Sequence, residues 1–568
     1  MQRASDGTVC ARTNRGFHLW SISRNLHIIY MLMVFAGPAL SARAGDFQMP
    51  KIKEPGFHAA VMNLADSGGV GDGRTLNTGA IDRALASLAA KGGGTLVIPP
   101  GIWLTGPIHL RSNIDLHLEA GSLLQFTSDF RQYPLIVVDV KGEKDVQSTS
   151  PISGENLENI AITGRGVIDG AGAAWRPLKK SKVTEAEWKA QMATGFVDAS
   201  GSTWWPSREA SEGGRLVRQL LTRKSFNLGD YEPAHQFLRP KLLKLLNCRR
   251  ILLEGVTFQN SPNWTLNPTL CEDLTIRGVT SRNPDFGQNT DALDVESCRN
   301  VIIRDSTFDV GDDGICLKSG LDAAGRRIGV PTENVWIDGC AVYHAHGGFT
   351  IGSEMSGGVR NIHVNDCLFM GTDIGLRFKS TRGRGGIVEK IYISNVRMTD
   401  ILGDAINFNM YYGGRPPLDA KGELKEGEQE KVAVDEGTPQ FRDIHIENIV
   451  CRGARNAVVL QGLPEMPIRD IWLRNVSITS QDGMMWMDAA DIHCDNVDII
   501  NSRGPVLTVY DTKDAVIDHL TYPAGAEALV KSQGNANRDI AFKNTDIKAA
   551  AKDFLLINGA TAEAFHVE

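Results

Sequence analysis

The sequence predicts an all-β fold, a parallel β-solenoid, from three observations. A short cassette recurs between residues 113 and 499, in which a polar turn residue precedes a short alternating apolar strand, as in Asn300-Val301-Ile302-Ile303. Well-spaced copies lie 27 residues apart: Leu274 to Val301, Val335 to Ile362 and Ile444 to Ile471. No helices intervene between the copies, and a period in the twenties with several short strands per turn is typical of a parallel β-solenoid. Leucine-rich repeats share the period, but their Leu-x-x-Leu-x-Leu-x-x-Asn consensus is absent.

The first 44 residues are predicted to be a secretory signal peptide. Several arginines precede an apolar run from Ile28 to Leu40, and Ser41-Ala42-Arg43-Ala44 has the small-residue pattern of a cleavage site. The run has 13 residues, too few to span a bilayer, and no later segment is apolar enough to do so. We therefore expect export to the periplasm or the cell exterior, with no membrane span after cleavage.

Residues 45–568 are expected to form one elongated domain with a helix over its N-terminal end. The segment from Asn77 to Ala90 has helical spacing of apolar residues, and Gly92-Gly93-Gly94 ends it before an apolar strand at 95–98. A solenoid otherwise exposes an unpaired strand edge at its end. The helix is therefore predicted to be a cap.

Two segments interrupt the repeat and are predicted to be insertions. Residues 175–231 are polar, partly helical and contain four tryptophans, whereas residues 411–439 carry Gly-Gly, Pro-Pro and a run of charges. Long loops on a rigid scaffold tend to be functional. The alternative is that both are decorative.

Composition excludes several classes of function. The formal charge of −7 provides no basic footprint, so nucleic acid is not an expected partner. Eight cysteines follow the signal peptide and none forms a Cys-x-x-Cys pair, so no metal or other cofactor is expected. Cys248, Cys271 and Cys298 each precede an apolar triplet by three residues, which favours stacked, buried, reduced thiols.

The strongest candidate site is a group of carboxylates and one histidine on successive repeats. Asp291 and Asp312 are 21 residues apart, about one coil, so we expect them to stack on neighbouring rungs roughly 4.8 Å apart. His346 lies 11 residues past its strand landmark, as Asp312 does one coil earlier, and Asp313 adds a third carboxylate. Such a column suits acid/base cleavage of a bond next to an anionic group.

The next coil adds a pair of cations. Arg377 and Lys379 alternate with Phe378, so on a strand the two cations face outward together and Phe378 faces the core. A fixed Arg beside a Lys is a good receptor for a sugar carboxylate. Lys318 and Arg382 are expected to extend this patch, together with Arg384.

Four motifs in this order resemble those of the polygalacturonases, family 28 of the glycoside hydrolases. They are Asn289-Thr290-Asp291, Gly311-Asp312-Asp313, His346-Gly347 and Arg377-Phe378-Lys379. The resemblance implies a right-handed parallel β-helix and hydrolysis of α-1,4-linked galacturonic acid in pectin or polygalacturonate by an exported monomer that needs no cofactor. Two positions depart from the family pattern, Ala345 in place of Gly and Phe378 in place of Ile, and neither changes a reacting group.

The resemblance also implies the role of each site residue. Asp312 would be the general acid, Asp291 and Asp313 would hold and deprotonate the water, and His346 would maintain their protonation states. Arg377 and Lys379 would bind the substrate carboxylate. Asn289 would orient a carboxylate or contact substrate. Tyr411 or Tyr412 would supply a tyrosine typical of the family, and Tyr412 is taken as the candidate for substrate binding.

Stereochemistry and mode of attack follow less directly. Carboxyl groups about 5 Å apart usually indicate retention, whereas the family inverts, and we expect inversion. Both insertions flank the column, so we expect them to block one end of the groove. Aromatic rings of the insertions, Arg382 or Arg384 would then contact a terminal sugar. A groove blocked at one end favours exo action.

Three alternatives remain open. One is a pectate-lyase-like enzyme, which would need a calcium cluster and would eliminate rather than hydrolyse. The second is a hydrolase of rhamnogalacturonan or xylogalacturonan. The third is a non-catalytic solenoid that binds acidic glycans, although binding alone has no use for three carboxylates that repel an anionic ligand.

Overall fold

The structure, a computed structural model, describes residues 50–419, 423, 425 and 430–568. The predicted signal peptide, residues 1–44, lies outside these residues. In the described part, 39 strands form one connected and largely parallel ladder, which confirms the predicted parallel β-solenoid. Residues Phe47–Glu568 form one compact unit.

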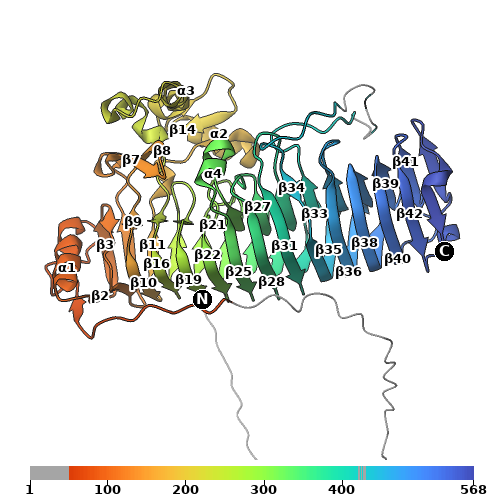
Figure 1. Cartoon of the computed structure of the whole chain (residues 1–568). Coiled ribbons are helices and arrows are strands. Elements are labelled where there is room, and N and C mark those ends of the chain that lie inside the picture. The colour runs from red at the N-terminus through yellow and green to blue at the C-terminus, as the bar shows by residue number, and fades with distance from the viewer. Residues whose placement is uncertain (1–49, 420–422, 424, 426–429) are drawn as a thin grey trace, which may run out of the picture. The chain divides into compact units, whose positions relative to one another are not determined.

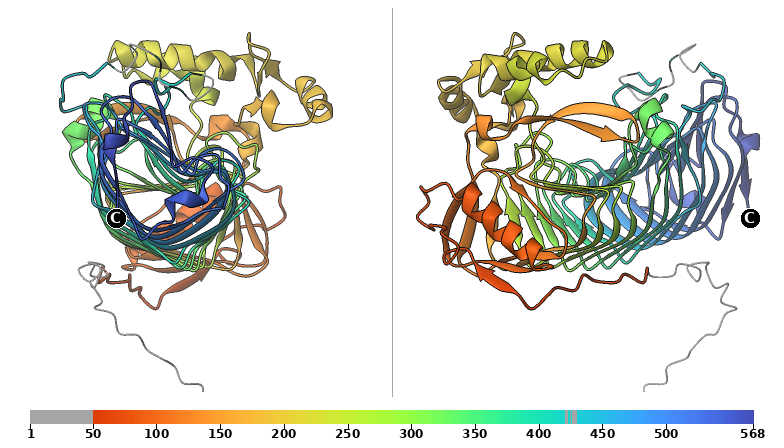
Figure 2. Two further views of the ribbon diagram at one scale, coloured as in Figure 1. Left: turned by 90° about the vertical axis from the view of Figure 1, so that its right-hand side faces the viewer. Right: turned by 60° about the vertical axis from the view of Figure 1, so that its left-hand side comes forward.

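Each full turn of the solenoid contributes one strand to each of three parallel sheets (Figure 1). The first sheet, called the site sheet below, contains in its central part β15 (Leu243–Leu246), β18 (Leu266–Thr269), β21 (Leu293–Glu296), β24 (Ile315–Lys318), β27 (Phe349–Gly352), β30 (Leu376–Lys379), β33 (Asp404–Asn409), the end of β35 (Ile444–Gln461), β37 (Met484–Met487) and β39 (Leu507–Tyr510). The second contains β22 (Arg299–Arg304), β25 (Thr332–Asp338), β28 (Val359–Asn365) and β31 (Ile387–Ser394), and the third contains β23 (Thr307–Asp309), β26 (Ala341–Tyr343), β29 (Leu368–Met370) and β32 (Arg397–Thr399). Figure 2 (left) looks along the stacked turns.

The polar residue that opens each cassette has a conformational reason. Asn300, Asn334 and Asn361 adopt φ values of 55° to 56°, a left-handed conformation that Asn tolerates better than most residues. Their amides also donate to one another along the stack, from Asn334 to Asn300 at 3.2 Å and from Asn361 to Asn334 at 2.6 Å. The repeated Asn therefore turns the chain into the strand and links adjacent turns.

The interior is a continuous apolar core. Phe378 is fully buried, as its alternation with Arg377 and Lys379 predicts, and its ring stacks on Phe408 of the next turn at 4.1 Å between centroids. The eight described cysteines are all buried and free, and Cys271 N donates to Cys298 Sγ at 3.3 Å, which confirms the predicted stack of reduced thiols.

A helix covers the N-terminal end, as predicted. Helix α1 (Thr78–Ala90) buries Ile81, Leu85 and Leu88 and is followed by β2 (Gly94–Ile98), which pairs with β1 (Val61–Asn63) at the start of the ladder of the second sheet. No helix in the described ranges is long and apolar enough to cross a membrane.

The first insertion folds as a small unit on the outside of the solenoid (Figure 2). It contains the three-stranded sheet of β12 (Leu178–Lys179), β13 (Phe196–Val197) and β14 (Thr203–Trp205), with helices α2 (Glu185–Met192) and α3 (Arg208–Thr222). Trp175, Trp188 and Trp204 are at most 6% exposed. These three rings are packed inside apolar clusters, so the expectation that they contact a sugar is wrong. Trp205 is half-buried and its ring centroid lies 6.1 Å from that of Phe237, and for this residue the expectation stays a prediction.

The second insertion, residues 411–439, is described only in part. It begins with an antiparallel bridge between Tyr411 and Thr381, and Tyr411 packs against the main core. Leu418 and Lys531 both line a cavity of about 260 Å³ on the C-terminal side of the site sheet. The part of this loop around Leu418 therefore lies over later turns of the solenoid, whereas the carbonyl of Gly437 accepts hydrogen bonds from Gly383 and Gly385 on an earlier turn.

Candidate active site

The register of the site sheet brings the predicted residues into one column. Leu293 pairs with Ile315 and Ile315 with Phe349, so Asp291 stands level with Asp313, and Asp312 with His346. The expectation that Asp291 stacks on Asp312 is therefore wrong by one residue, because this turn is 22 residues long. The match between Asp312 and His346 is confirmed by the bond from His346 N to Asp312 O at 2.9 Å.

Asp291, Asp312 and Asp313 lie together at the start of strands β21 and β24. One oxygen of each lies within 4.8 Å of the others. Asp291 is 3% exposed and Asp313 is fully buried, whereas the Asp312 side chain is 18% exposed. Asp312 is therefore the most accessible of the three carboxylates.

Asp291 and Asp313 have opposite electrostatic environments. Burial raises the pKa of Asp291 well above its usual value, and the charges of Asp294 and Asp312 raise it further. Burial would also raise the pKa of Asp313, but Lys379 and Arg377 outweigh it and hold that pKa below the usual range. Two equivalent positions on adjacent turns thus carry one protonatable and one permanently ionised carboxyl group.

Arg377 and Lys379 contact Asp313 directly. Arg377 Nη1 donates to Oδ1 at 3.0 Å, and Lys379 Nζ donates to Oδ2 at 2.7 Å. The ring of Tyr412 lies 5.0 Å from the Lys379 ammonium and 5.9 Å from the Arg377 guanidinium. Tyr412 therefore faces the cation pair, whereas Tyr411 belongs to the core.

His346 lies between carboxylates and a lysine of the first insertion. Its Nδ1 is 3.2 Å from Asp312 Oδ1, and its Nε2 is 3.6 Å from Asp373 Oδ2. Lys182 Nζ lies 3.5 Å from the same Nε2. The first insertion thus reaches the column, so the view of it as decorative is wrong.

Asn289 is exposed beside the column and is held by Arg239. Asn289 Oδ1 accepts from Arg239 Nη2 at 2.9 Å, and Arg239 also binds the carbonyl of Gln288 at 2.7 Å. Burial lowers the pKa of Arg239 to about 10, against the opposing charges of Asp312 and Asp291. Arg239 therefore holds positive charge beside the carboxylates.

Lys318 is 3% exposed, and its ammonium pairs with Glu354 at 3.0 Å and with Asp294 at 3.5 Å. The indole of Trp264 covers it at 4.6 Å. Lys318 therefore supplies charge from beneath the column, and does not extend the exposed patch as expected.

Arg382 and Arg384 do not join the cation pair. Arg382 forms two hydrogen bonds with the buried Glu465, at 2.6 and 2.9 Å, and Arg384 pairs with Asp322. Their charges are committed to these partners, so the expected contact with a terminal sugar is not supported.

Four residues near the column were missed by the sequence reasoning. Asp294 lies three residues past Asp291 and could have been found from strand parity, since it shares the outward face with Glu296. Arg239, Lys182 and Glu354 lie outside every motif, and no local pattern indicates them. Their placement depends on how the first insertion and the loop after β27 fold.

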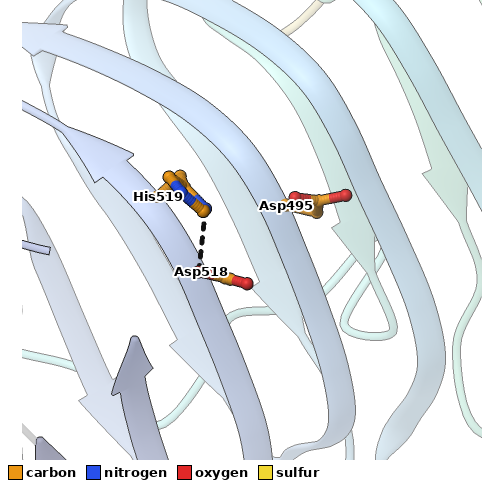
Figure 3. Close-up of side chains that lie close together, drawn as sticks. All are labelled: Asp495, Asp518 and His519. Carbon is orange, nitrogen blue, oxygen red and sulfur yellow. Dashed lines mark ion pairs between the residues drawn. The ribbon is translucent and has the colours of Figure 1, made fainter. Parts of the chain in front are cut away.

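Within the part of the chain that the structure describes, two groups of side chains have a composition suited to a metal ion. In the column, both oxygens of Asp313 already accept from Arg377 and Lys379, so a cation there would meet two positive charges. The second group is Asp495, Asp518 and His519 on the outer surface (Figure 3). Asp518 pairs with His519 at 2.9 Å and Asp495 with Arg474 at 3.5 Å, an ordinary surface ladder of charges.

Comparisons with known proteins agree with the site. The family model of "Glycosyl hydrolases family 28" matches residues 183–498. A probable polygalacturonase of Vitis vinifera is 28% identical over 77% of this chain and 79% of its own length. An exo-poly-alpha-D-galacturonosidase of Dickeya chrysanthemi is 24% identical over 78% and 71%. The crystal structure of an exopolygalacturonase from Thermotoga maritima, at 31% identity, superposes with a TM-score of 0.64 over 79% of this chain and 93% of that one.

Proposed function

Because the chain belongs to family 28 of the glycosyl hydrolases, a family of right-handed parallel β-helices, we propose that it is an exported enzyme that hydrolyses α-1,4-galacturonosidic bonds from one end of polygalacturonate chains. The observation that carries the proposal is the column of three carboxylates within 4.8 Å, next to Arg377 and Lys379. The carboxylates supply acid and base, and the cations supply a receptor for a uronate carboxyl group.

Asp312 is the residue placed to protonate the glycosidic oxygen. It is the most accessible carboxylate of the three, and it contacts His346 Nδ1 at 3.2 Å. His346 is thus placed to orient the Asp312 carboxyl group while the proton is transferred. This assignment agrees with the role that the family motif implies.

Asp291 and Asp313 have different roles toward the attacking water. Asp291 Oδ1 has no hydrogen-bond partner among the described residues, and the raised pKa makes Asp291 the stronger base. Asp313 is held ionised and fixed by two cations, so it orients the water without taking its proton. Because both Asp313 oxygens are engaged, Asp313 is a poor nucleophile, which supports attack by water and inversion despite the short separation.

The two sides of the column support action at a chain end. The first insertion reaches the middle of the column, where Lys182 comes within 3.5 Å of His346. On the C-terminal side, a cavity of about 330 Å³ extends from Arg377 to Met485 along the site sheet. A released sugar would lie against the insertion, and the remaining chain would continue over the cation pair.

Digestion of polygalacturonate tests this proposal. We expect mono- or digalacturonate from the first minutes, a slow fall in viscosity, and the β-anomer as the first product by proton NMR. A rapid viscosity drop with a ladder of mid-length oligomers would contradict exo action. An unsaturated product whose formation stops when calcium is chelated would show that the enzyme is a lyase and not a hydrolase.

A further inference from the structure

The groove on the C-terminal side of the column changes character along its floor. The register places Arg377, Asn407, Val459 and Met485 in one row on β30, β33, β35 and β37. Three steps of roughly 4.8 Å make this row about 14 Å long. A cation is therefore followed by an amide and then by two apolar side chains.

The charges of the groove are confined to the end near the carboxylates. Among the described residues that line the cavity, the only cations are Arg377 and Lys379, and both contact Asp313. The far half is lined by neutral amides and apolar groups, which are Asn409, Asn456, Val459, Gln461 and Met485. Arg503 and Lys531 line the neighbouring cavity beyond Met485, and they are paired with Asp482 and Glu423. A free carboxylate desolvated in the far half would therefore find no cation in the lining of its own cavity, which is costly.

A carboxylate on the groove wall adds repulsion. Asp404 lines the same cavity, and Asn456 Nδ2 donates to its Oδ1 at 2.6 Å while Asn407 Nδ2 donates to its Oδ2. These two amides hold the carboxylate in place beside Asn407, one turn beyond Arg377. Burial raises the pKa of Asp404, against the opposing effect of the two amides and of Arg455. When Asp404 is ionised, a second uronate carboxylate at this position meets a like charge.

We propose that the groove selects a sugar whose C6 group is uncharged, a methyl-esterified galacturonate, at the second position beyond the cleaved bond. This rests on the proposed function, because it takes the first position to be the free uronate held by Arg377 and Lys379. The methyl ester lies beside Asn407 and reaches towards Val459 on the next turn, with Met485 one turn further along the groove. Loss of its charge removes the repulsion from an ionised Asp404. The enzyme thus acts on partly esterified pectin as well as on polygalacturonate.

Half-esterified hexagalacturonate, with esters at random positions, is the probe. After brief digestion, mass spectrometry maps the esters on the remaining chains, counted from the newly formed end. We expect esters to be depleted at least fivefold at the first residue and enriched at least threefold at the second. Depletion at the first residue tests the proposed function, whereas enrichment at the second tests the groove.

Met485→Lys supplies the missing charge in the far half of the groove. This variant should abolish the enrichment at the second residue and raise kcat/KM for unesterified hexagalacturonate at least threefold. Ile500→Lys is the matched control, since Ile500 is 42% exposed on β38 (Ala489–Asn501), does not line the cavity and adds the same charge. The control should leave both ester frequencies unchanged.

Two results would overturn the proposal. One is a random or depleted ester frequency at the second residue in the wild-type enzyme. The other is a Met485→Lys variant that melts like wild type and keeps the wild-type pattern. If the enzyme hydrolyses neither the half-esterified nor the unesterified hexagalacturonate, the proposed function fails. Binding titrations with unesterified hexagalacturonate then still test the proposed selectivity of the groove, because equal affinities of the wild type and Met485→Lys would refute it.

Discussion

The turns that hold the carboxylate column and the turns on its C-terminal side use the same outward strand positions for different purposes. In the turns of the column, outward-facing charges are buried and paired, as Lys318 on β24 is with Glu354 and with Asp294 on β21. On the C-terminal side, the corresponding rows carry amides and apolar groups and line an open cavity of about 330 Å³. The first region therefore fixes the electrostatics of the reacting groups, and the second is free to bind a chain.

The largest expected effect is at Asp312, in the carboxylate column itself. Asp312→Asn keeps the volume of the side chain but cannot donate the required proton, so we expect turnover to fall by a factor of about 10² to 10⁴. The melting temperature should stay within about 2 °C of wild type, because Asp312 is not part of the buried core. Near wild-type turnover would remove Asp312 from the mechanism.

Strand β30 allows stability and binding to be separated within three residues. Phe378→Ala should lower the free energy of unfolding by roughly 3–5 kcal/mol, because it leaves a cavity against Phe408. Arg377→Ala and Lys379→Ala should mainly raise KM for uronate substrates and make it more sensitive to salt. Denaturant unfolding measures the stability effect, and initial rates measure the effect on KM. A Phe378→Ala variant that unfolds like wild type would contradict the strand register.

The contact between the first insertion and the column can be removed by a single change. Lys182→Ala removes the insertion's cation next to His346, so we expect about a tenfold loss of kcat/KM on digalacturonate, the scale of one charge-assisted hydrogen bond. Lys189→Ala, on the exposed face of α2 in the same insertion, is the matched control. Equal effects of the two variants would mean that Lys182 acts only through the net charge.

The sequence predicts the fold better than it predicts the site's surroundings, for a physical reason. Periodicity is a local property, so the cassettes identify the solenoid, the cap at α1 and the inward position of Phe378. The column was predicted because a repeat converts residue spacing into position in space, to within one residue for Asp291. Arg239, Lys182 and the pairing of Arg382 with Glu465 join segments with no common period, so only the folded insertions reveal them.

The smallest effect concerns a buried acid on the C-terminal side of the column, Asp488. Asp488 is 5% exposed, and burial, with the nearby charge of Asp511, raises its pKa to about 8. The folded state therefore binds a proton more tightly than the unfolded chain, and its contribution to stability is lost as the pH rises from about 4 through 8.

Asp488→Asn cannot ionise, so it should raise the melting temperature by about 1–3 °C at pH 8 relative to wild type. The gain should shrink as the pH falls towards 5, where wild-type Asp488 is already protonated. Asp82→Asn, on the exposed face of α1, should show no such pH dependence, because the Asp82 side chain is 63% exposed. Thermal melts at pH 5 and pH 8 check the prediction, and a stabilisation that is equal at both values would show that Asp488 is not protonated in the folded enzyme.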